Sequence, residues 1–229
     1  MFTRATVIGA ILAVLATTGI ATAAVAHSHS ASDGAWTPVD GNATQPAVKK
    51  PATGQSKPAD KVPALKAAQL QYEHQSWGDP TTEVNMTIWA PKGWKKVKLT
   101  PLEAKFTSPN GLWNLRVNAT QTDQLLKAAT DNRYALIKAS VEDFHLISRT
   151  TGSIRATNVN YQSMVFHHQT LTYTYTDPTR GPRLVIDRFV SLGTNPHPLF
   201  ETTTGGRPQD AAALAAVTTK ATEDFIRLP

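Results

Sequence analysis

The chain contains no cysteine among its 229 residues. This absence excludes disulfides, thiolate metal sites, cysteine nucleophiles and the lipidated cysteine of bacterial lipoproteins. The patterns G-x-S-x-G, H-E-x-x-H, Walker A and G-x-G-x-x-G are also absent. The common catalytic and nucleotide-binding frameworks are therefore unsupported, and we expect a protein that is not an enzyme and holds no cofactor.

A strong concentration of charge is lacking as well. The net charge of +6 is divided equally, with +3 before residue 72 and +3 from residue 72 onward. Such a mild and diffuse basic balance attracts acidic surfaces without specificity, and it does not by itself indicate nucleic-acid binding. We therefore expect a protein or a component of the cell envelope as partner, with anionic lipid or a wall polymer as candidates, and no nucleic acid.

Residues 1–26 have the composition of a secretory signal. Arg4 precedes the apolar run from Val7 to Ala16, and small residues lead up to Ala26. An uncleaved membrane anchor is the alternative, because at 1.5 Å per residue this stretch is long enough to span about 30 Å of hydrocarbon. In either case the rest of the chain is expected outside the cell or on the outer face of the cytoplasmic membrane.

Residues 27–71 are rich in Pro, Ala and Lys and have no apolar periodicity. Such a segment cannot bury enough apolar area to offset the entropy of ordering, so we expect a disordered tether. If cleavage follows Ala26, the mature chain begins His27-Ser28-His29. Its free amine, two backbone amides and the third-residue imidazole, with His27 competing, could then hold one square-planar Cu(II) or Ni(II). The alternative is a polar spacer with accidental histidines.

A β-hairpin is the clearest signal in the folded domain, which we place at residues 72–229. Two β-rich runs, residues 164–175 and 184–192, flank a turn of Asp, Pro and Gly residues at 177–182. Alternation within each run predicts one buried and one exposed face. Phe166 lies on the opposite parity from Leu171, which predicts a bulge near residues 167–169.

Further elements surround this hairpin. We expect strands at residues 84–89, 104–107, 113–119, 146–148, 154–156 and 199–203, and a terminal helix after Pro208 with the stripe Leu214, Val217, Ala221 and Phe225. Asp123 is a good N-cap for a helical pattern that extends to Phe144, either as one amphipathic helix or as a pair broken at Asp131-Asn132. Runs of strands with one helix inserted and one appended indicate an α+β fold in which helices flank an antiparallel β-sheet.

The order of these signals resembles the Mog1/PsbP-like family. The resemblance covers residues 77–228 and rests on Ala-Pro-Lys-Gly-Trp at 90–94, Ser-Pro-Asn-Gly before Trp113, the Tyr-rich strand at 171–175 and a closing helix ending at Phe225. The chain is most similar to the secreted actinobacterial, LpqN-like branch, although it lacks that branch's lipidated cysteine. The resemblance implies an α/β/α sandwich and a non-enzymatic binding or accessory role in the cell envelope.

Candidate binding residues occur in two places. Trp94, Lys95 and Lys96 form a basic turn that could present an indole to anionic headgroups or wall polymers. Tyr173 and Tyr175 could form a ligand-facing wall on the central hairpin. The alternatives are a solvated turn in the first place and cross-strand packing in the second.

Two other functions stay open. The carboxylates Asp177, Asp187 and Glu201 fall on or beside the late strands, so an envelope hydrolase with an acid pair is conceivable, with solvated partners of arginine as the alternative. A purely structural, wall-associated protein is the other possibility.

The adjacent His167 and His168 point to opposite faces of a strand and cannot share one metal without a bulge.

Overall fold

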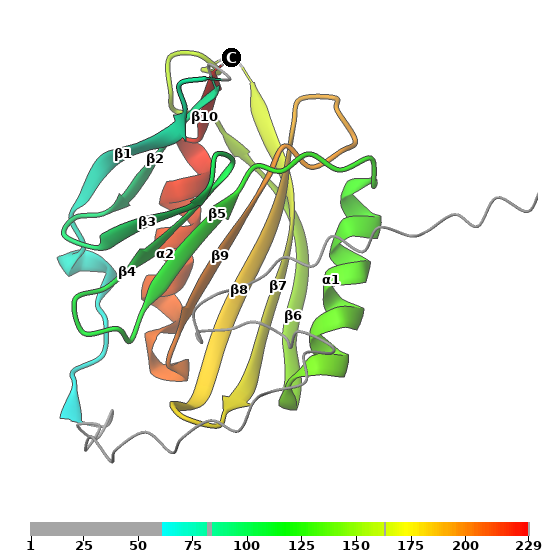
Figure 1. Cartoon of the computed structure of the whole chain (residues 1–229). Coiled ribbons are helices and arrows are strands. Elements are labelled where there is room, and N and C mark those ends of the chain that lie inside the picture. The colour runs from blue at the N-terminus through cyan, green and yellow to red at the C-terminus, as the bar shows by residue number, and fades with distance from the viewer. Residues whose placement is uncertain (1–60, 82–83, 163, 229) are drawn as a thin grey trace, which may run out of the picture.

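Two antiparallel sheets and two helices make up the fold (Figure 1). The structure is a computed structural model that describes residues 61–81, 84–162 and 164–228. The predicted signal or anchor, the proposed His27 and His29 metal site and most of the predicted tether lie outside these residues. The predicted α+β class, with an antiparallel sheet flanked by helices, is confirmed.

The larger sheet has seven strands in the order β3-β4-β5-β9-β8-β7-β6, and every neighbouring pair is antiparallel. Its strands are β3 (Lys95–Thr100), β4 (Glu103–Thr107), β5 (Asn114–Asn118), β6 (Glu142–Arg155), β7 (Val165–Asp177), β8 (Gly181–Leu192) and β9 (Phe200–Gly206). The predicted central hairpin is β7 and β8. Gly181 lies at its turn with φ 71°, a conformation that L side chains rarely adopt.

The smaller sheet has the order β1-β2-β10. Its strands are β1 (Tyr72–Asp79), β2 (Val84–Pro91) and β10 (Ile226–Leu228). Helix α1 (Leu126–Ser140) contacts β7 and β8 of the large sheet, whereas α2 (Ala211–Glu223) contacts β8, β9 and β2. Two short 3-10 turns, η2 (Ala67–Gln69) and η3 (Pro208–Asp210), precede β1 and α2.

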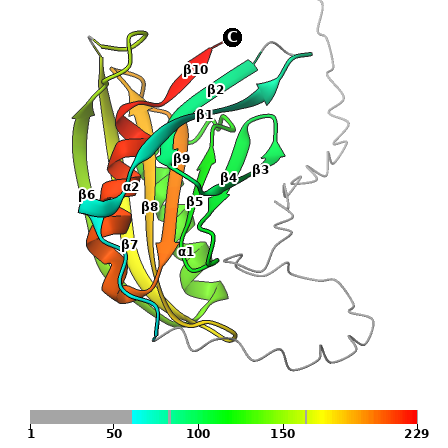
Figure 2. The same cartoon turned by 90° about the vertical axis from the view of Figure 1, so that its left-hand side faces the viewer.

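The layers follow from these contacts. Figures 1 and 2 show α1 and α2 on opposite faces of the seven-stranded sheet, with the small sheet on the α2 side. The main core lies between the large sheet, α2 and the small sheet, and it includes Met86, Phe106, Phe200 and Phe225, each at most 1% exposed. Phe200 and Phe225 stack with their ring centroids 3.9 Å apart.

The central hairpin differs from its prediction in one respect. The pairing of β7 with β8 is continuous from Phe166 to Asp177, so no bulge interrupts residues 167–169. Phe166 packs in the α2-side core and Leu171 packs against α1. The prediction of one wet face was wrong because helices cover both faces of the sheet here, so opposite parities can both be apolar.

The helices and flanking strands also differ in their boundaries. Helix α1 ends at Ser140, and Phe144 belongs to β6, which is one long strand in place of the two short ones predicted. Two register shifts in β6, one of them just after Glu142, let it stay paired with β7. Asp123 does not cap α1, since the cap position is Leu125.

Residues 61–71, which the prediction assigned to the tether, pack on the domain. The guanidinium of Arg207 donates to the carbonyl oxygens of Val62 and Pro63 at 2.7 and 2.9 Å. The backbone amide of Leu65 donates to Asp210 Oδ1 at 2.8 Å. The folded domain therefore begins before the predicted boundary at residue 72.

Candidate ligand-binding pocket

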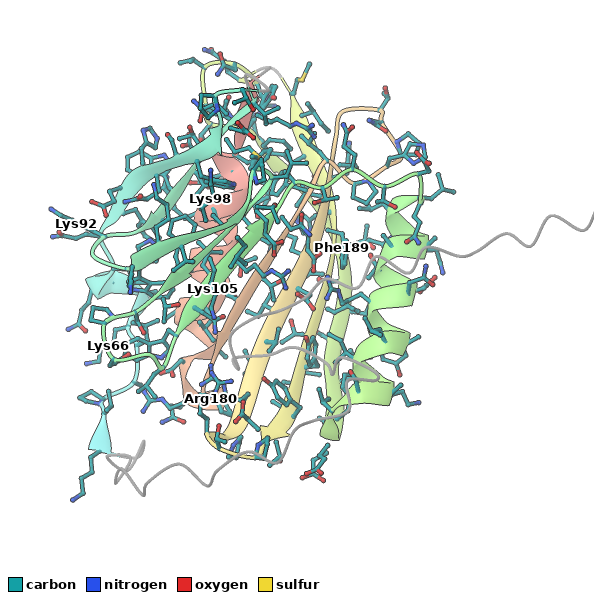
Figure 3. All side chains as sticks on the ribbon, in the orientation of Figure 1. Lys66, Lys92, Lys98, Lys105, Arg180 and Phe189 are labelled. Atoms are coloured by element: carbon teal, nitrogen blue, oxygen red, sulfur yellow. The ribbon has the colours of Figure 1, made fainter. Side chains whose placement is uncertain are left out.

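Helix α1 borders a pocket on its face of the large sheet. The pocket has a volume of about 550 Å³, within the range of small-molecule sites. Its lining consists of the β5–α1 connection, the first turns of α1, and the ends of β8 and β9. The lining residues are Asn118, Thr120, Gln121, Thr122, Gln124, Ala129, Asn132, Arg133, Leu136, Phe189, Pro198, Phe200 and Glu201. Figure 3 shows Phe189 on the sheet beside α1.

An ion pair lies within this lining. Arg133 of α1 donates from Nη2 to both carboxylate oxygens of Glu201 on β9, at 2.6 and 2.7 Å. The Arg133 guanidinium also lies 5.9 Å from the ring centroid of Phe189. Burial works to lower the pKa of Arg133, but the charges of Glu201 and Asp187 outweigh it and raise that pKa. Arg133 therefore keeps its positive charge, which lies next to the carboxylate of Glu201.

A second carboxylate, that of Asp187 on β8, lies close to this pair. Asp187 is 0% exposed, and its Oδ2 accepts a hydrogen bond of 3.1 Å from the hydroxyl of Tyr173. Burial raises the pKa of Asp187 to about 6, because the attraction of Arg133 does not offset burial and the repulsion of Glu201. The positive charge of one guanidinium, that of Arg133, thus interacts with two carboxylates.

Several polar atoms on this face are buried without a hydrogen-bond partner. They are Arg183 Nη2, Asp187 Oδ1 and Asn114 Oδ1, and their residues are 1%, 0% and 2% exposed. Asn114 pairs in register with Gly205, where a Cβ would lie 2.9 Å from Asn114 Oδ1. Buried polar groups are nearly always hydrogen-bonded, so these three atoms are exceptions, although none of their residues lines the pocket.

The structure places the two predicted tyrosines in the interior. Tyr173 and Tyr175 are 2% and 7% exposed and pack with Ile137 of α1. The hydroxyl of Tyr173 contacts Asp187, and burial raises the pKa of Tyr173 well above 10. Neither residue lines the pocket, so cross-strand packing, the alternative interpretation, describes them.

The basic turn differs more strongly from its prediction. Trp94 is 7% exposed and belongs to the main core, so the prediction that the turn presents its indole was wrong. Lys96 donates from Nζ to the carbonyl oxygen of Ser76 at 2.7 Å, and Lys98 does the same to Gly78 at 3.1 Å. Both lysines therefore cap backbone carbonyls of β1. Lys95 remains exposed on β3.

The three candidate carboxylates do not form a catalytic pair. Asp177 lies at the β7–β8 turn, where burial works against ionisation but hydrogen bonds from Arg180 and Thr179 lower its pKa to about 2. Asp187 and Glu201 are near one another, yet Arg133 binds Glu201 and Asp187 has no exposed surface. A general acid must reach the bond that it protonates.

Sequence analysis missed the pocket and its key residue, Arg133. On the sequence this arginine is one polar position of an amphipathic helix, and no local pattern distinguishes it from Lys127 or Lys138. Only the fold brings it to Glu201, 68 residues later in the chain. The nearest signal was the polar pair Asp187 and Glu201 on strands otherwise rich in apolar residues.

Comparison with known proteins finds likeness in structure but none in sequence. The structure is similar to the crystal structure of the Ran-binding protein Mog1p from Saccharomyces cerevisiae, with a TM-score of 0.40 and 8% sequence identity over 68% of this chain and 96% of that one. No protein-family model and no curated protein matches the sequence. The α+β class of the chain rests on its own sheet order and helix positions.

Two other searches of the described residues gave negative results. None of the helices there is long and apolar enough to cross a membrane. The same part of the chain brings no three His, Asp or Glu side chains together in a way that could hold a metal ion. The predicted His27 and His29 site lies outside this part and stays a prediction.

Proposed function

We propose that this chain is a non-enzymatic binding module of the bacterial cell envelope and that its pocket beside α1 binds a neutral, hydroxyl-rich ligand such as a sugar unit. The observation that carries this proposal is the lining itself. Amides, hydroxyls and a charge-balanced Arg133–Glu201 pair surround the apolar surface of Phe189.

The chemistry of the lining favours a neutral ligand over an ion. The lining contains one cation and one anion, Arg133 and Glu201, and they pair with each other. Sugar hydroxyls both donate and accept, so they match side-chain amides, hydroxyls and the outer edges of an ion pair. Apolar contact with the C–H face of a sugar ring is available from Leu136, which is 55% exposed, whereas Phe189, at 6% exposure, presents little surface to the pocket.

The carboxylates support binding over catalysis. Hydrolysis of a glycosidic bond requires two carboxyl groups that flank it, one of which gives up a proton. Glu201 is held by Arg133 with both oxygens, and the protonatable Asp187 is sealed from the pocket at 0% exposure. Among the described residues neither Glu201 nor Asp187 is placed to act as the acid, and this supports binding over the alternative of an envelope hydrolase.

Placement in the envelope rests on the sequence. The arginine, apolar run and small residues of positions 1–26 support export, with or without cleavage. Mass spectrometry of the protein from its native host should find an amino terminus at His27 if the signal is cleaved there. Recovery of the full-length chain in the cytoplasmic fraction would contradict export.

A matched pair of variants tests the pocket. Asn132→Trp introduces a bulky side chain at a lining position of α1, and Ala135→Trp introduces the same side chain at an exposed position of the same helix that does not line the pocket. Titration calorimetry with cellobiose, maltose and chitobiose should show saturable binding to the wild-type protein. We expect binding at least tenfold weaker for Asn132→Trp and unchanged for Ala135→Trp.

Other outcomes would change the conclusion. Equal weakening by both tryptophan variants would indicate a general disturbance of α1 and would remove the pocket as the site. Saturable binding of neutral peptides with no binding of sugars would overturn the ligand class. Release of shorter sugars that Glu201→Gln abolishes would overturn the non-enzymatic function.

A further inference from the structure

Arg188 of β8 lies on the opposite face of the large sheet from the pocket. It is half-buried beneath the last turn of α2. Its Nε donates to Thr170 Oγ1 at 3.1 Å, and its Nη1 reaches Thr219 Oγ1 and Thr222 Oγ1 at 3.5 and 3.4 Å. The guanidinium of Arg188 thus contacts hydroxyl groups from one strand, β7, and one helix, α2.

No carboxylate of the described residues forms an ion pair with Arg188. Burial lowers the pKa of Arg188 to about 10, with no opposing contribution from an acid. Two other buried arginines have carboxylate partners, since Arg133 pairs with Glu201 and Arg207 pairs with Asp210. Arg183, which is 1% exposed, is like Arg188 in having no ion pair among the described residues. The carbonyls at the negative end of α2 offset only part of an arginine charge.

The neighbours of Arg188 do not supply the missing charge. His168, which lies one residue pair away on β7, is buried, and its pKa is lowered to about 4 by burial and by the charges of Arg188 and His167. It is therefore a neutral imidazole at pH 7. Thr202, the register partner of Arg188 on β9, is 0% exposed, and its Oγ1 has no hydrogen-bond partner.

One edge of the guanidinium remains open. Among the described residues Nη2 of Arg188 makes no hydrogen bond, and it is not one of the buried unpaired atoms, so it reaches the surface. Burying a cation without a counter-ion costs free energy, and a bound anion would offset this cost. Guanidinium groups bind planar and tetrahedral oxyanions with two parallel hydrogen bonds.

We propose that Arg188, with the hydroxyl of Thr219, forms a binding site for an oxyanion, the phosphate or carboxylate group of a ligand, where β8 meets the last turn of α2. This site is separate from the sugar pocket, because the large sheet lies between them. The anionic group of the ligand supplies the negative charge that no described side chain places next to Arg188.

Calorimetric titration of the full chain with inorganic phosphate, and separately with acetate, tests this site at constant ionic strength. The wild-type protein should bind at least one of them saturably. Arg188→Met keeps the length of the apolar stem and removes the guanidinium, and we expect at least a tenfold loss of affinity. The matched control is Arg155→Met, which removes an exposed arginine of β6 that has no ion pair among the described residues.

The two ligands and the variants separate the outcomes. Phosphate without acetate would identify a tetrahedral anion, and acetate without phosphate a carboxylate. If Arg155→Met weakens anion binding as much as Arg188→Met does, the anions are attracted diffusely to a basic protein and the proposed site is wrong. The proposed site is also wrong if the wild-type protein binds neither anion. If Arg188→Met does not fold, Arg188→Lys decides, because it keeps the charge but loses the paired donors and should weaken binding about tenfold.

Discussion

Replacing Asp187 by asparagine should stabilise the protein at neutral pH. The carboxyl group is 0% exposed, and its pKa is raised to about 6 because it is buried beside a guanidinium that already serves Glu201. Asparagine has nearly the same shape and can still accept the hydrogen bond from the Tyr173 hydroxyl. It leaves Arg133 and Glu201 as a balanced pair.

The expected magnitude follows from the pKa. In an unfolded chain the aspartate pKa is about 3.9, and each pH unit of difference between the two states corresponds to about 1.4 kcal/mol. A folded pKa of about 6 therefore means that ionised Asp187 lowers the free energy of unfolding by about 3 kcal/mol above pH 6. We expect Asp187→Asn to recover about 1 to 3 kcal/mol at pH 7, since the new amide N–H groups also need partners.

The pH dependence makes this prediction specific. Because the folded pKa lies above the unfolded one, the contribution of Asp187 is most favourable below about pH 4 and is lost as pH rises to about 6. Urea titrations at pH 4, 5, 6, 7 and 8 should therefore show the advantage of Asp187→Asn growing from pH 4 to 6 and then staying constant. Asp131→Asn, at a more exposed carboxylate of α1, is the control.

A different result would refute the reasoning. If Asp187→Asn lowers the free energy of unfolding by more than about 1 kcal/mol at every pH, the ionised Asp187 is a net stabilising partner of Arg133. The account of the network as one guanidinium shared by two carboxylates would then be wrong.

Three further predictions concern other parts of the molecule. Phe225→Ala should lower the free energy of unfolding by about 3 to 5 kcal/mol in a denaturant titration, because the ring is fully buried, whereas Val159→Ala at a 77% exposed position should change it by less than about 0.5 kcal/mol. His168→Gln should flatten the rise in stability between about pH 4 and 6.5, since the pKa of His168 is lowered to about 4 in the fold; equal slopes in both proteins would exclude His168. Lys95→Glu should weaken sedimentation with anionic vesicles without lowering the Tm, because Lys95 is exposed, and unchanged sedimentation at low salt would remove the lipid candidate.

Much of the fold was predictable because its signals are local. The turn residues at 177–182 and the alternation beside them located β7 and β8, and Asn110-Gly111 located the turn between β4 and β5. The apolar stripe of α2 was found for the same reason, since Leu214, Val217 and Ala221 are all buried. Each of these signals lies within one turn or one strand.

The rest depended on contacts between distant residues. Strand β3 was missed because its six residues are all exposed, so its Lys-rich sequence has the composition of a solvated turn. The pocket depends on Arg133 meeting Glu201, and the burial of Trp94 depends on a core formed by strands of both sheets and by α2. Spacing along the chain contains no information about such pairs.

The two-sided burial of β8 also bears on how the chain finds its register. From Arg183 to Asp187 every side chain is buried, so a slip by one residue would not expose an apolar face to water. It would instead move the side chains of Arg183 and Asp187 to the α2 side of the sheet and the side chains of Leu184 and Ile186 to the α1 side. Misaligned pairing would leave these charged side chains without their native neighbours, so the buried ionic residues also contribute to folding specificity.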